Sequence, residues 1–372
     1  NGGRVEAAES IVVSPTADEP ICIDPFETGG YPVHCRTLTV EVVQDEASRL
    51  RALATILDLR KQGWIPTGGE LQTAGLIHHM SLDVLVDADN GRIERFDPSQ
   101  QVVAFEPSRR TAGESCRDPV HLLRGMVGET LAGGSARRLR EIFGGALGCS
   151  HLLTLAQLVV SFLPGAIARE AANAHGRRRG RESGERIAKR IVVVDGFERR
   201  SGNQEIAIQL TDVHTLPFAG MVGTLDRLGA QHEVRAIFQV DAAATTIRAF
   251  DVAERIRTRA ELGTATWQSR SGELDWLDGQ PVMRGLAPEL LRRYGADPAR
   301  EPLLAALINF APAFVQSLSP RVTRMIEQGA REGSRPRIMD ESGFGGFPDS
   351  CYIWRTGGRM TKMRQAAEDA GD

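Results

Sequence analysis

The sequence has few residues of the kinds that support covalent amine or thiol chemistry. Its only lysines are Lys61, Lys189 and Lys362, so a Schiff-base mechanism would have to use one of these three side chains. The five cysteines lie far apart and form no CxxC pair, so neither a disulfide framework nor a structural zinc site is indicated. This use of cysteine fits a reducing cytoplasm best.

Several diagnostic motifs and segments are also absent. No G-x-G-x-x-G follows a strand pattern, and neither G-x-x-x-x-G-K-[ST] nor G-x-S-x-G occurs, so nucleotide cofactors and the hydrolase elbow lack support. The net charge of -3 gives no general attraction to nucleic acid or anionic membranes. We expect no membrane span and no signal peptide. The prediction is a cytoplasmic protein that binds neither nucleic acid nor membrane.

The sequence does contain an internal repeat. When residues 36–125 are shifted forward by 154 positions without a gap, identical residues recur at many places, including Arg36/Arg190, Asp58/Asp212, His78/His232, Asp87/Asp241 and Phe96/Phe250. Such a repeat indicates a duplicated unit of about one domain length. We expect the two copies to face each other across a pseudo-twofold axis, with a cleft where they meet.

The repeat divides the chain into five segments. Residues 1–30 are predicted to be an extended arm, 31–172 the first copy, 173–189 a basic linker, 190–330 the second copy and 331–372 a C-terminal segment. The linker carries Arg177, Arg178, Arg179 and Arg181 and is expected to be solvated. The cluster at 349–354 is apolar enough that we expect the C-terminal segment to pack back on the body.

Each copy is predicted to hold about four antiparallel strands followed by helices. The alternation of Ile206, Ile208 and Leu210 with less apolar residues is typical of a half-buried strand, and it identifies 50–59 as the equivalent strand of the first copy. Helices are predicted at 120–131, 136–143, 150–169, 289–294 and 303–317, with Pro164 and Pro312 kinking or ending theirs. The fold class is α+β, with two tandem, pseudo-twofold-related copies of an antiparallel sheet covered by helices.

The histidines shared by the copies are the sharpest candidates for chemistry. His78 and His232 hold equivalent places at strand starts, and both are expected near the pseudo-twofold axis, although a structural role explains them at least as well. Asp58 and Asp212 could orient a histidine, act as a base or cap a turn.

A Gly-Cys-Ser-His element at 148–151 occurs in the first copy alone. Ser150 can cap the following helix, and the helix N-terminus could lower the pKa of Cys149, although a packing cysteine is the simpler interpretation. Cys149 and His151 are not expected to face each other. His78, His151 and Asp58 could gather a metal, but no HxH or HExxH spacing supports this, so no metal and no cofactor are predicted.

The motifs Ile77-His78-His79-Met80, Gly148-Cys149-Ser150-His151-Leu152 and Asp349-Ser350-Cys351 resemble those of a bacterial family of unknown function. The resemblance covers most of the chain, although the second copy lacks the Gly-Cys-Ser-His element. Members of that family look linked to the catabolism of plant-derived aromatic compounds, and the chain is similar to the phenylcoumaran γ-formaldehyde lyases of lignin-degrading bacteria.

The resemblance implies a lyase that releases formaldehyde from the hydroxymethyl side chain of a phenylcoumaran-type dimer by acid/base chemistry. His78 is the candidate base, with His151 and Tyr352 as alternates and Arg36 or Arg190 as anion holders. His232, Asp58 and Cys149 complete the expected substrate-binding set. The alternatives are a binding protein for an aromatic or acyl compound and a cofactor-free decarboxylase or hydrolase. The expected partner is a small aromatic substrate, and a homodimer is possible.

Overall fold

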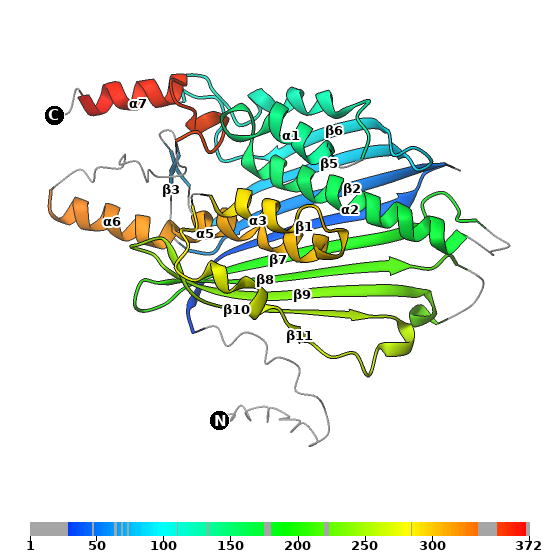
Figure 1. Ribbon diagram of the computed structural model, residues 1–372. Helices are drawn as coiled ribbons and strands as arrows, with labels where there is room; N and C mark the ends of the chain where they lie inside the picture. Colours follow the sequence, from blue (N-terminus) through cyan, green and yellow to red (C-terminus); the bar gives the residue numbers. More distant parts are fainter. Residues whose placement is uncertain are drawn as a thin grey trace, which may run out of the picture.

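Most of the chain is built on one large antiparallel sheet. The computed structural model describes residues 29–46, 48–62, 65–67, 70–72, 74–109, 111–131, 134–174, 180–218, 223–283, 285–333 and 348–369. Within these residues a nine-stranded sheet has the order β11-β10-β9-β8-β7-β1-β2-β5-β6 (Figure 1). Its strands are β1 (Tyr31–Gln44), β2 (Arg49–Arg60), β5 (Gly75–Asp87), β6 (Ile93–Val102), β7 (Arg186–Glu198), β8 (Gln204–Thr215), β9 (Leu228–Asp241), β10 (Thr246–Arg257) and β11 (Gln268–Ser269). A separate hairpin pairs β3 (Ile65–Thr67) with β4 (Glu70–Gln72).

The two halves of the chain contribute matching parts of this sheet. The strands β1-β2-β5-β6 and β7-β8-β9-β10 follow each other in the same order, and the halves join edge to edge where β1 pairs with β7. The four strands predicted for each half are therefore present. They form two parts of one continuous sheet, because the first strand of each half uses its free edge to pair with the other. The common origin of the halves stays a prediction.

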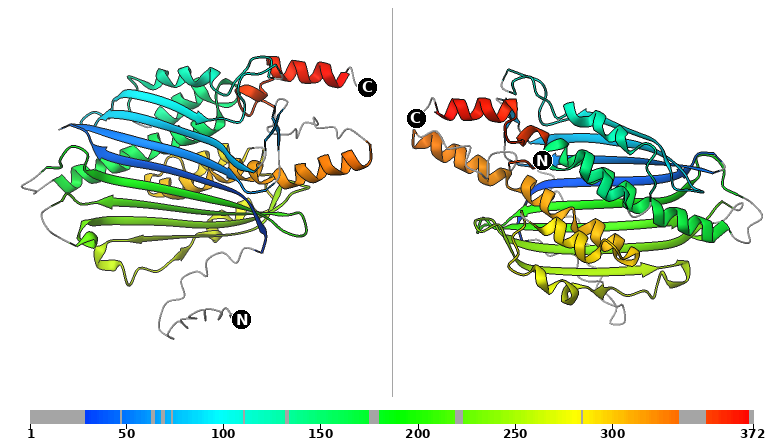
Figure 2. Two further views of the ribbon diagram at one scale, coloured as in Figure 1. Left: turned by 180° about the vertical axis from the view of Figure 1, so that it is seen from behind. Right: turned by 45° about the horizontal axis from the view of Figure 1, so that its top comes forward.

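Helices cover one face of the sheet, and the core lies between the two layers. Strand β1 alternates buried Leu38, Val40 and Val42 with half-buried Thr37 and Thr39, the period of two that a one-sided sheet requires. In Figure 2 the view from behind shows the other face uncovered by the described helices. The helices are α1 (Ser135–Phe143), α2 (Ser150–Ala174), α3 (Leu286–Tyr294), α4 (Glu301–Leu307), α5 (Phe310–Ser317), α6 (Ser319–Arg331) and α7 (Arg359–Asp369). Short 3-10 turns are η1 (Asp118–Met126), η2 (Gly145–Leu147), η3 (Thr224–Arg227), η4 (Arg259–Glu261), η5 (Ser271–Leu277), η6 (Pro298–Arg300) and η7 (Tyr352–Trp354).

The long helix α2 differs from its prediction in two ways. It runs on to Ala174 with Pro164 inside it, so this proline does not end the helix. Its stretch Ser150–Ala172 is also long and apolar enough to cross a membrane, contrary to the expectation that no run approaches that length. However, 56% of the most apolar window is buried inside the protein, which is typical of a core helix packed on a sheet.

Other helical predictions are corrected in detail. The region predicted as a helix at 120–131 is a 3-10 turn that ends at Met126. The predicted helix at 303–317 is divided into α4 and α5, and Pro312 lies in the first turn of α5, where its missing N–H is tolerated.

The segments outside the two halves give mixed results. Arg181 of the predicted solvated linker is buried and pairs with Glu170 and Glu185, whereas Arg177, Arg178 and Arg179 lie outside the described residues. Most of the N-terminal arm, residues 1–28, also lies outside them. In the described part of the C-terminal segment, Ile353 and Trp354 are buried in the core.

Candidate functional site

The site begins with a row of three side chains across neighbouring strands. The strand register places Arg36 of β1 opposite Asp58 of β2, and Asp58 opposite His78 of β5. All three are on the helix-covered face and almost fully buried. Sequence alone indicated these residues one by one, and antiparallel pairing brings them together because opposite residues point to the same face.

A β-bulge directs His78 into the covered face. The register of β2 and β5 passes from Asp58↔His78 to Leu59↔Leu76, so Ile77 is an extra residue in β5. Ile77 and His78 are consequently buried together, while Leu76 and His79 on either side are more exposed. Bulges re-aim side chains in this way and are frequent beside functional sites.

The carboxylate of Asp58 is the centre to which the surrounding groups converge. Arg36 donates from Nε to Oδ1 at 2.6 Å and from Nη2 to Oδ2 at 3.1 Å, and His78 Nδ1 lies 3.1 Å from Oδ2. Helix α2 brings His151 Nε2 to 3.2 Å from Oδ2, and β1 brings His34 Nε2 to 3.3 Å from Oδ1. The rings of His78 and His151 are 3.8 Å apart between centroids and tilted by 33°.

The environment sets the charge of each group in this cluster. Burial alone would raise the pKa of Asp58, but Arg36 and His151 outweigh it and hold that pKa well below its usual range. Burial, followed by the neighbouring His78, lowers the pKa of His151 to about 3. Burial also lowers the pKa of His34. Asp58 is therefore a carboxylate at neutral pH, and His151 and His34 are neutral imidazoles.

These charges assign the tautomer of His78. Because Asp58 is ionised, its Oδ2 can only accept, so the hydrogen bond requires the proton of His78 to be on Nδ1. In the neutral ring, Nε2 is then the acceptor. The same reasoning places the proton of His151 on Nε2 and leaves Nδ1 as its acceptor, 4.0 Å from the sulfur of Cys149.

A cavity of about 1250 Å³ opens beside this cluster. Residues of both halves line it, since α2 and the strands of the first half face α3 and α5 of the second. Its lining includes Arg36, Arg60, His78, Cys149, Ser150, His151, Met283, Leu291, Ile308, Val315, Gln316, Cys351, Tyr352 and Trp354. The cavity is mainly apolar, with the polar cluster at one wall, an arrangement suited to an aromatic ligand.

Cys149 does not have the character of a nucleophile. It is buried, and burial raises the pKa of its thiol to about 12, which outweighs the backbone N–H groups at the start of α2. The hypothesis of a thiolate is therefore wrong. The expectation that Cys149 and His151 do not face each other is corrected too, because Sγ and Nδ1 lie within 4.0 Å.

Tyr352 reaches the cavity from the C-terminal segment. Its backbone N–H donates to the carbonyl oxygen of Gly148 at 2.8 Å, which fixes the turn η7 beside the start of α2. The guanidinium of Arg355 stacks 3.7 Å from the centroid of its ring. Burial raises the pKa of Tyr352, so its phenol is protonated at neutral pH.

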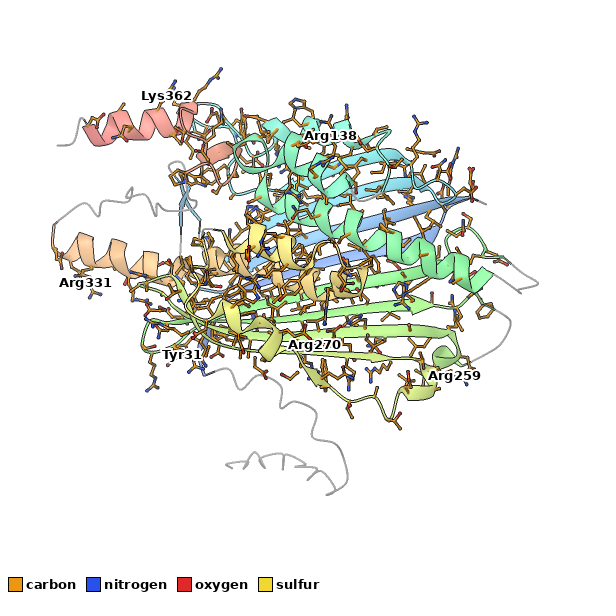
Figure 3. All side chains as sticks on the ribbon, in the orientation of Figure 1. Tyr31, Arg138, Arg259, Arg270, Arg331 and Lys362 are labelled. Carbon is orange, nitrogen blue, oxygen red and sulfur yellow. The ribbon has the colours of Figure 1, made fainter. Side chains whose placement is uncertain are left out.

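The matching row of the second half, Arg190, Asp212 and His232, lies outside the cavity lining. Arg190 is engaged on two edges, by Asp212 and by Glu301 at the start of α4. His232 donates from Nε2 to Oε1 of Glu254 at 2.7 Å, and Glu254 also pairs with Arg270, which Figure 3 labels. Arg190 and His232 are therefore not part of the cavity wall that Arg36, His78 and His151 line.

His78 and His232 are also not close to the pseudo-twofold axis. They lie on β5 and β9, which have β2, β1, β7 and β8 between them. Five strand spacings correspond to about 24 Å. The expectation that both histidines lie near a pseudo-twofold axis is wrong, because the halves join between β1 and β7 and each histidine is on the third strand from that junction.

Sequence reasoning missed two residues of the site. Arg60 lies on the same face of β2 as Asp58. His34 of β1 lies opposite Arg60. Their positions in the repeat correspond to His214 and Ala188, so they differ between the halves. A search for polar residues spaced by two along predicted strands would have found both, because such residues share a face.

Comparison with known proteins gives a family match for part of the chain. Residues 34–162, about a third of the chain from β1 to the middle of α2, match the family described as "Protein of unknown function (DUF2889)". This range contains Arg36, Asp58, His78, Cys149 and His151, and it agrees with the expected resemblance to a family of unknown function. The chain matches none of the curated proteins and none of the solved structures with which it was compared.

Proposed function

We propose that the protein is a carbon–carbon lyase in the catabolism of lignin-derived aromatics, which releases formaldehyde from the hydroxymethyl side chain of a phenylcoumaran-type dimer. The observation that carries the proposal is His78, a base candidate held by Asp58 at the wall of a large, mainly apolar cavity. The cavity exceeds the roughly 300–1,000 Å³ of common small-molecule pockets, so a two-ring compound has room.

The reaction balances without an external oxidant or reductant. A base removes the proton of the γ-hydroxyl group, and the bond between the β and γ carbons breaks as the γ carbon leaves as formaldehyde. The released electron pair forms a double bond between the α and β carbons, and the ether bond from the α carbon to the second ring breaks. The ether oxygen becomes a phenoxide on the second ring, which stays bonded to the β carbon and takes up one proton, so the products are formaldehyde and a stilbene.

His78 fits the role of the base in this sequence. Its Nδ1 proton is held by Asp58, which directs the Nε2 lone pair as the acceptor and stabilises the imidazolium that forms. His151 contacts the same oxygen of Asp58 and helps to hold that carboxylate in position beside His78. Tyr352, whose phenol keeps its proton at neutral pH, can donate to the phenoxide oxygen that forms when the ether bond opens.

The arginines supply the electrostatic part of the mechanism. Negative charge moves during the reaction from the alkoxide to the phenoxide. Arg36 and Arg60 are buried at the cavity wall, where a positive charge stabilises a developing anion far more than it does in water. Arg190 is not used, because Asp212 and Glu301 already engage it.

The same cluster has the composition of a metal site, and this bears on the test. The ligand atoms of Asp58, His78 and His151 all lie within 4.8 Å of one another. However, Arg36 donates a hydrogen bond to each oxygen of Asp58, and Arg60 is a second buried cation nearby. A divalent ion would add two positive charges to a cluster that already has more arginine than carboxylate, so we favour acid/base chemistry.

The test is incubation of the purified protein with a phenylcoumaran, with formaldehyde and the stilbene measured in the presence and absence of a chelator. We expect equimolar products that survive the chelator, and a loss of at least about 100-fold in kcat for His78→Ala. His79→Ala is the matched control, because His79 is the next residue of β5 and points to the opposite face.

Other outcomes would move the protein to another class. Equal loss in His78→Ala and His79→Ala would reject His78 as the base, and activity abolished by the chelator and restored by a divalent ion would make the cluster a metal centre. Saturable binding without any product would indicate a binding protein for aromatic compounds. Release of carbon dioxide or of an acid would indicate a decarboxylase or a hydrolase.

A further inference from the structure

The buried arginines of the two halves have different hydrogen-bond partners. In the second half, Arg190 presents one guanidinium edge to Asp212 and another to Glu301, with Nη1 and Nη2 each donating to a Glu301 oxygen at 2.6 Å. One arginine there meets two carboxylates. In the first half, Arg36 presents the equivalent edge, Nε and Nη2, to Asp58.

The second edge of Arg36 has no such carboxylate. Its Nη1 is buried without a hydrogen-bond partner, as are Nε and Nη1 of Arg60, among the residues that the structure describes. Arg60 has a weak contact, from Nη2 to the side-chain oxygen of Gln316 at 3.5 Å. Both arginines line the cavity, so their unpaired donors lie at its wall.

The charges of the first half are consequently unbalanced. Arg36 and Arg60 bring two positive charges, whereas Asp58 brings one negative charge and is already in contact with Arg36, His78 and His151. A buried cation without a compensating negative charge is strongly unfavourable. The first half lacks the counterpart of Glu301, because α2 begins with Ser150 and His151, where α4 begins with Glu301.

We propose that a carboxylate group of the ligand takes the place that Glu301 has in the second half, and that it binds to Arg60 and to the free Nη1 of Arg36. The substrate class is then a two-ring aromatic compound that carries a carboxylate. This inference rests on the proposed function where it identifies the ligand as the substrate, but the binding itself does not depend on turnover. Gln316 stands beside the carboxylate and marks the second-half wall of the subsite.

The first experiment compares two probes by isothermal titration calorimetry at pH 7, trans-stilbene-4-carboxylate and the neutral trans-stilbene-4-carboxamide. We expect the carboxylate to bind about tenfold or more tightly than the amide, since charge-assisted bidentate bonds are lost in the amide. Arg60→Gln should remove this difference, and Arg60→Lys should keep part of it. Arg292→Gln is the matched control, because Arg292 also lines the cavity but is exposed and paired with Glu289.

A second variant tests the same subsite without removing a buried cation. Gln316→Glu places an internal carboxylate beside Arg60, as Glu301 is placed beside Arg190. We expect this variant to have a higher Tm than the wild type and to lose its preference for the carboxylate probe.

The inference is overturned if the wild type binds both probes equally or does not bind the carboxylate at millimolar concentration. It is also overturned if Arg60→Gln weakens both probes alike, or if Gln316→Glu leaves the preference intact. A third probe, 4-hydroxystilbene, distinguishes a phenolate subsite: ionisation of the bound phenol at pH 7, seen as an absorbance shift, would replace the carboxylate assignment. Carboxylate binding without formaldehyde release would keep the subsite and reject the lyase, whereas release with Arg60→Gln unimpaired would do the reverse.

Discussion

At the scale of single residues, the buried histidines make the protein sensitive to acid. The pKa of His151 is about 3 in the folded protein, against about 6.5 when the chain is unfolded. Between these values the unfolded state binds more protons, so the stabilising contribution is complete above about pH 6.5 and is lost as the pH falls toward 3. His34 contributes in the same direction.

The variant His151→Gln removes one of these titrations. We expect the free energy of unfolding to depend on pH less steeply than in the wild type, by up to about 1.4 kcal/mol per pH unit between pH 6 and 4. Urea denaturation at a series of pH values measures this slope. The exposed His121 supplies the control, since His121→Gln should leave the slope unchanged. An unchanged slope in His151→Gln would show that His151 is protonated in the folded state.

The thiols provide a second prediction at this scale. Burial raises the pKa of Cys149 to about 12 and that of Cys35 to about 11, and it also raises the pKa values of Cys116 and Cys351. We expect these four to react slowly with iodoacetamide at pH 7.5 and rapidly once the protein is unfolded, because the thiolate is the reactive form. Mass spectrometry of the labelled peptides distinguishes the sites. Cys149→Ala should keep most of the formaldehyde release, and rapid native labelling of Cys149 would contradict its assignment as a packing residue.

Much of the candidate site was accessible from the sequence. Arg36, Asp58 and His78 could be selected because they recur in both halves, and Cys149 and His151 because they do not. The sequence raised the gathering of Asp58, His78 and His151 only as a possible metal site that no ligand spacing supported, since the contact between Asp58 and His151 depends on how α2 packs across the sheet. The possibility that the helix N-terminus lowers the pKa of Cys149 is wrong, because burial is a tertiary property and outweighs it, in agreement with the packing cysteine that the sequence favoured.

At the scale of elements, the contact between β7 and α4 depends on one buried cation. Arg190→Met would leave Asp212 and Glu301 side by side without the cation that pairs with both of them. We expect a loss of about 3–5 kcal/mol in the free energy of unfolding at pH 7, measured by urea denaturation. The loss should shrink at acidic pH, where the two carboxyl groups can take up protons. The exposed Arg292 provides the comparison, and a cost for Arg190→Met as small as that of Arg292→Met would contradict the role of this cluster.

The strands were predictable from their pattern, and the way they assemble was not. The alternation along 206–210 has the period of a half-buried strand, the repeat extends this prediction to 50–59, and β8 and β2 confirm both strands. Nothing in that pattern indicates that β1 and β7 pair with each other. Alternation identifies a segment as a strand, but it does not identify the strands beside it. The bulge at Ile77 was equally hidden, since an extra residue inside an apolar run does not alter the composition.

At the scale of the whole molecule, the β1–β7 pairing joins both halves into one body. Their register extends from Tyr31↔Glu198 to Val43↔Arg186, and α5 packs against strands of both halves. We expect a chain cleaved at a protease site introduced between Ala174 and Gly180 to elute from a size-exclusion column as one species of unchanged size. It should also unfold in a single transition. Separation of the two fragments under native conditions would show that the halves are independent domains.

The central place of β1 has a consequence for how the protein is made. The first half can begin to fold once α2 has been synthesised, but the strand that covers the outer edge of β1 ends only at Glu198. At the roughly 5–20 residues per second of protein synthesis, that edge stays open for about one to five seconds on the ribosome. A long open edge readily pairs with the same edge of a neighbouring nascent chain. Ribosomes that follow each other closely on one mRNA would therefore favour misassembly between their nascent chains. A slower rate of translation initiation should raise the yield of native protein.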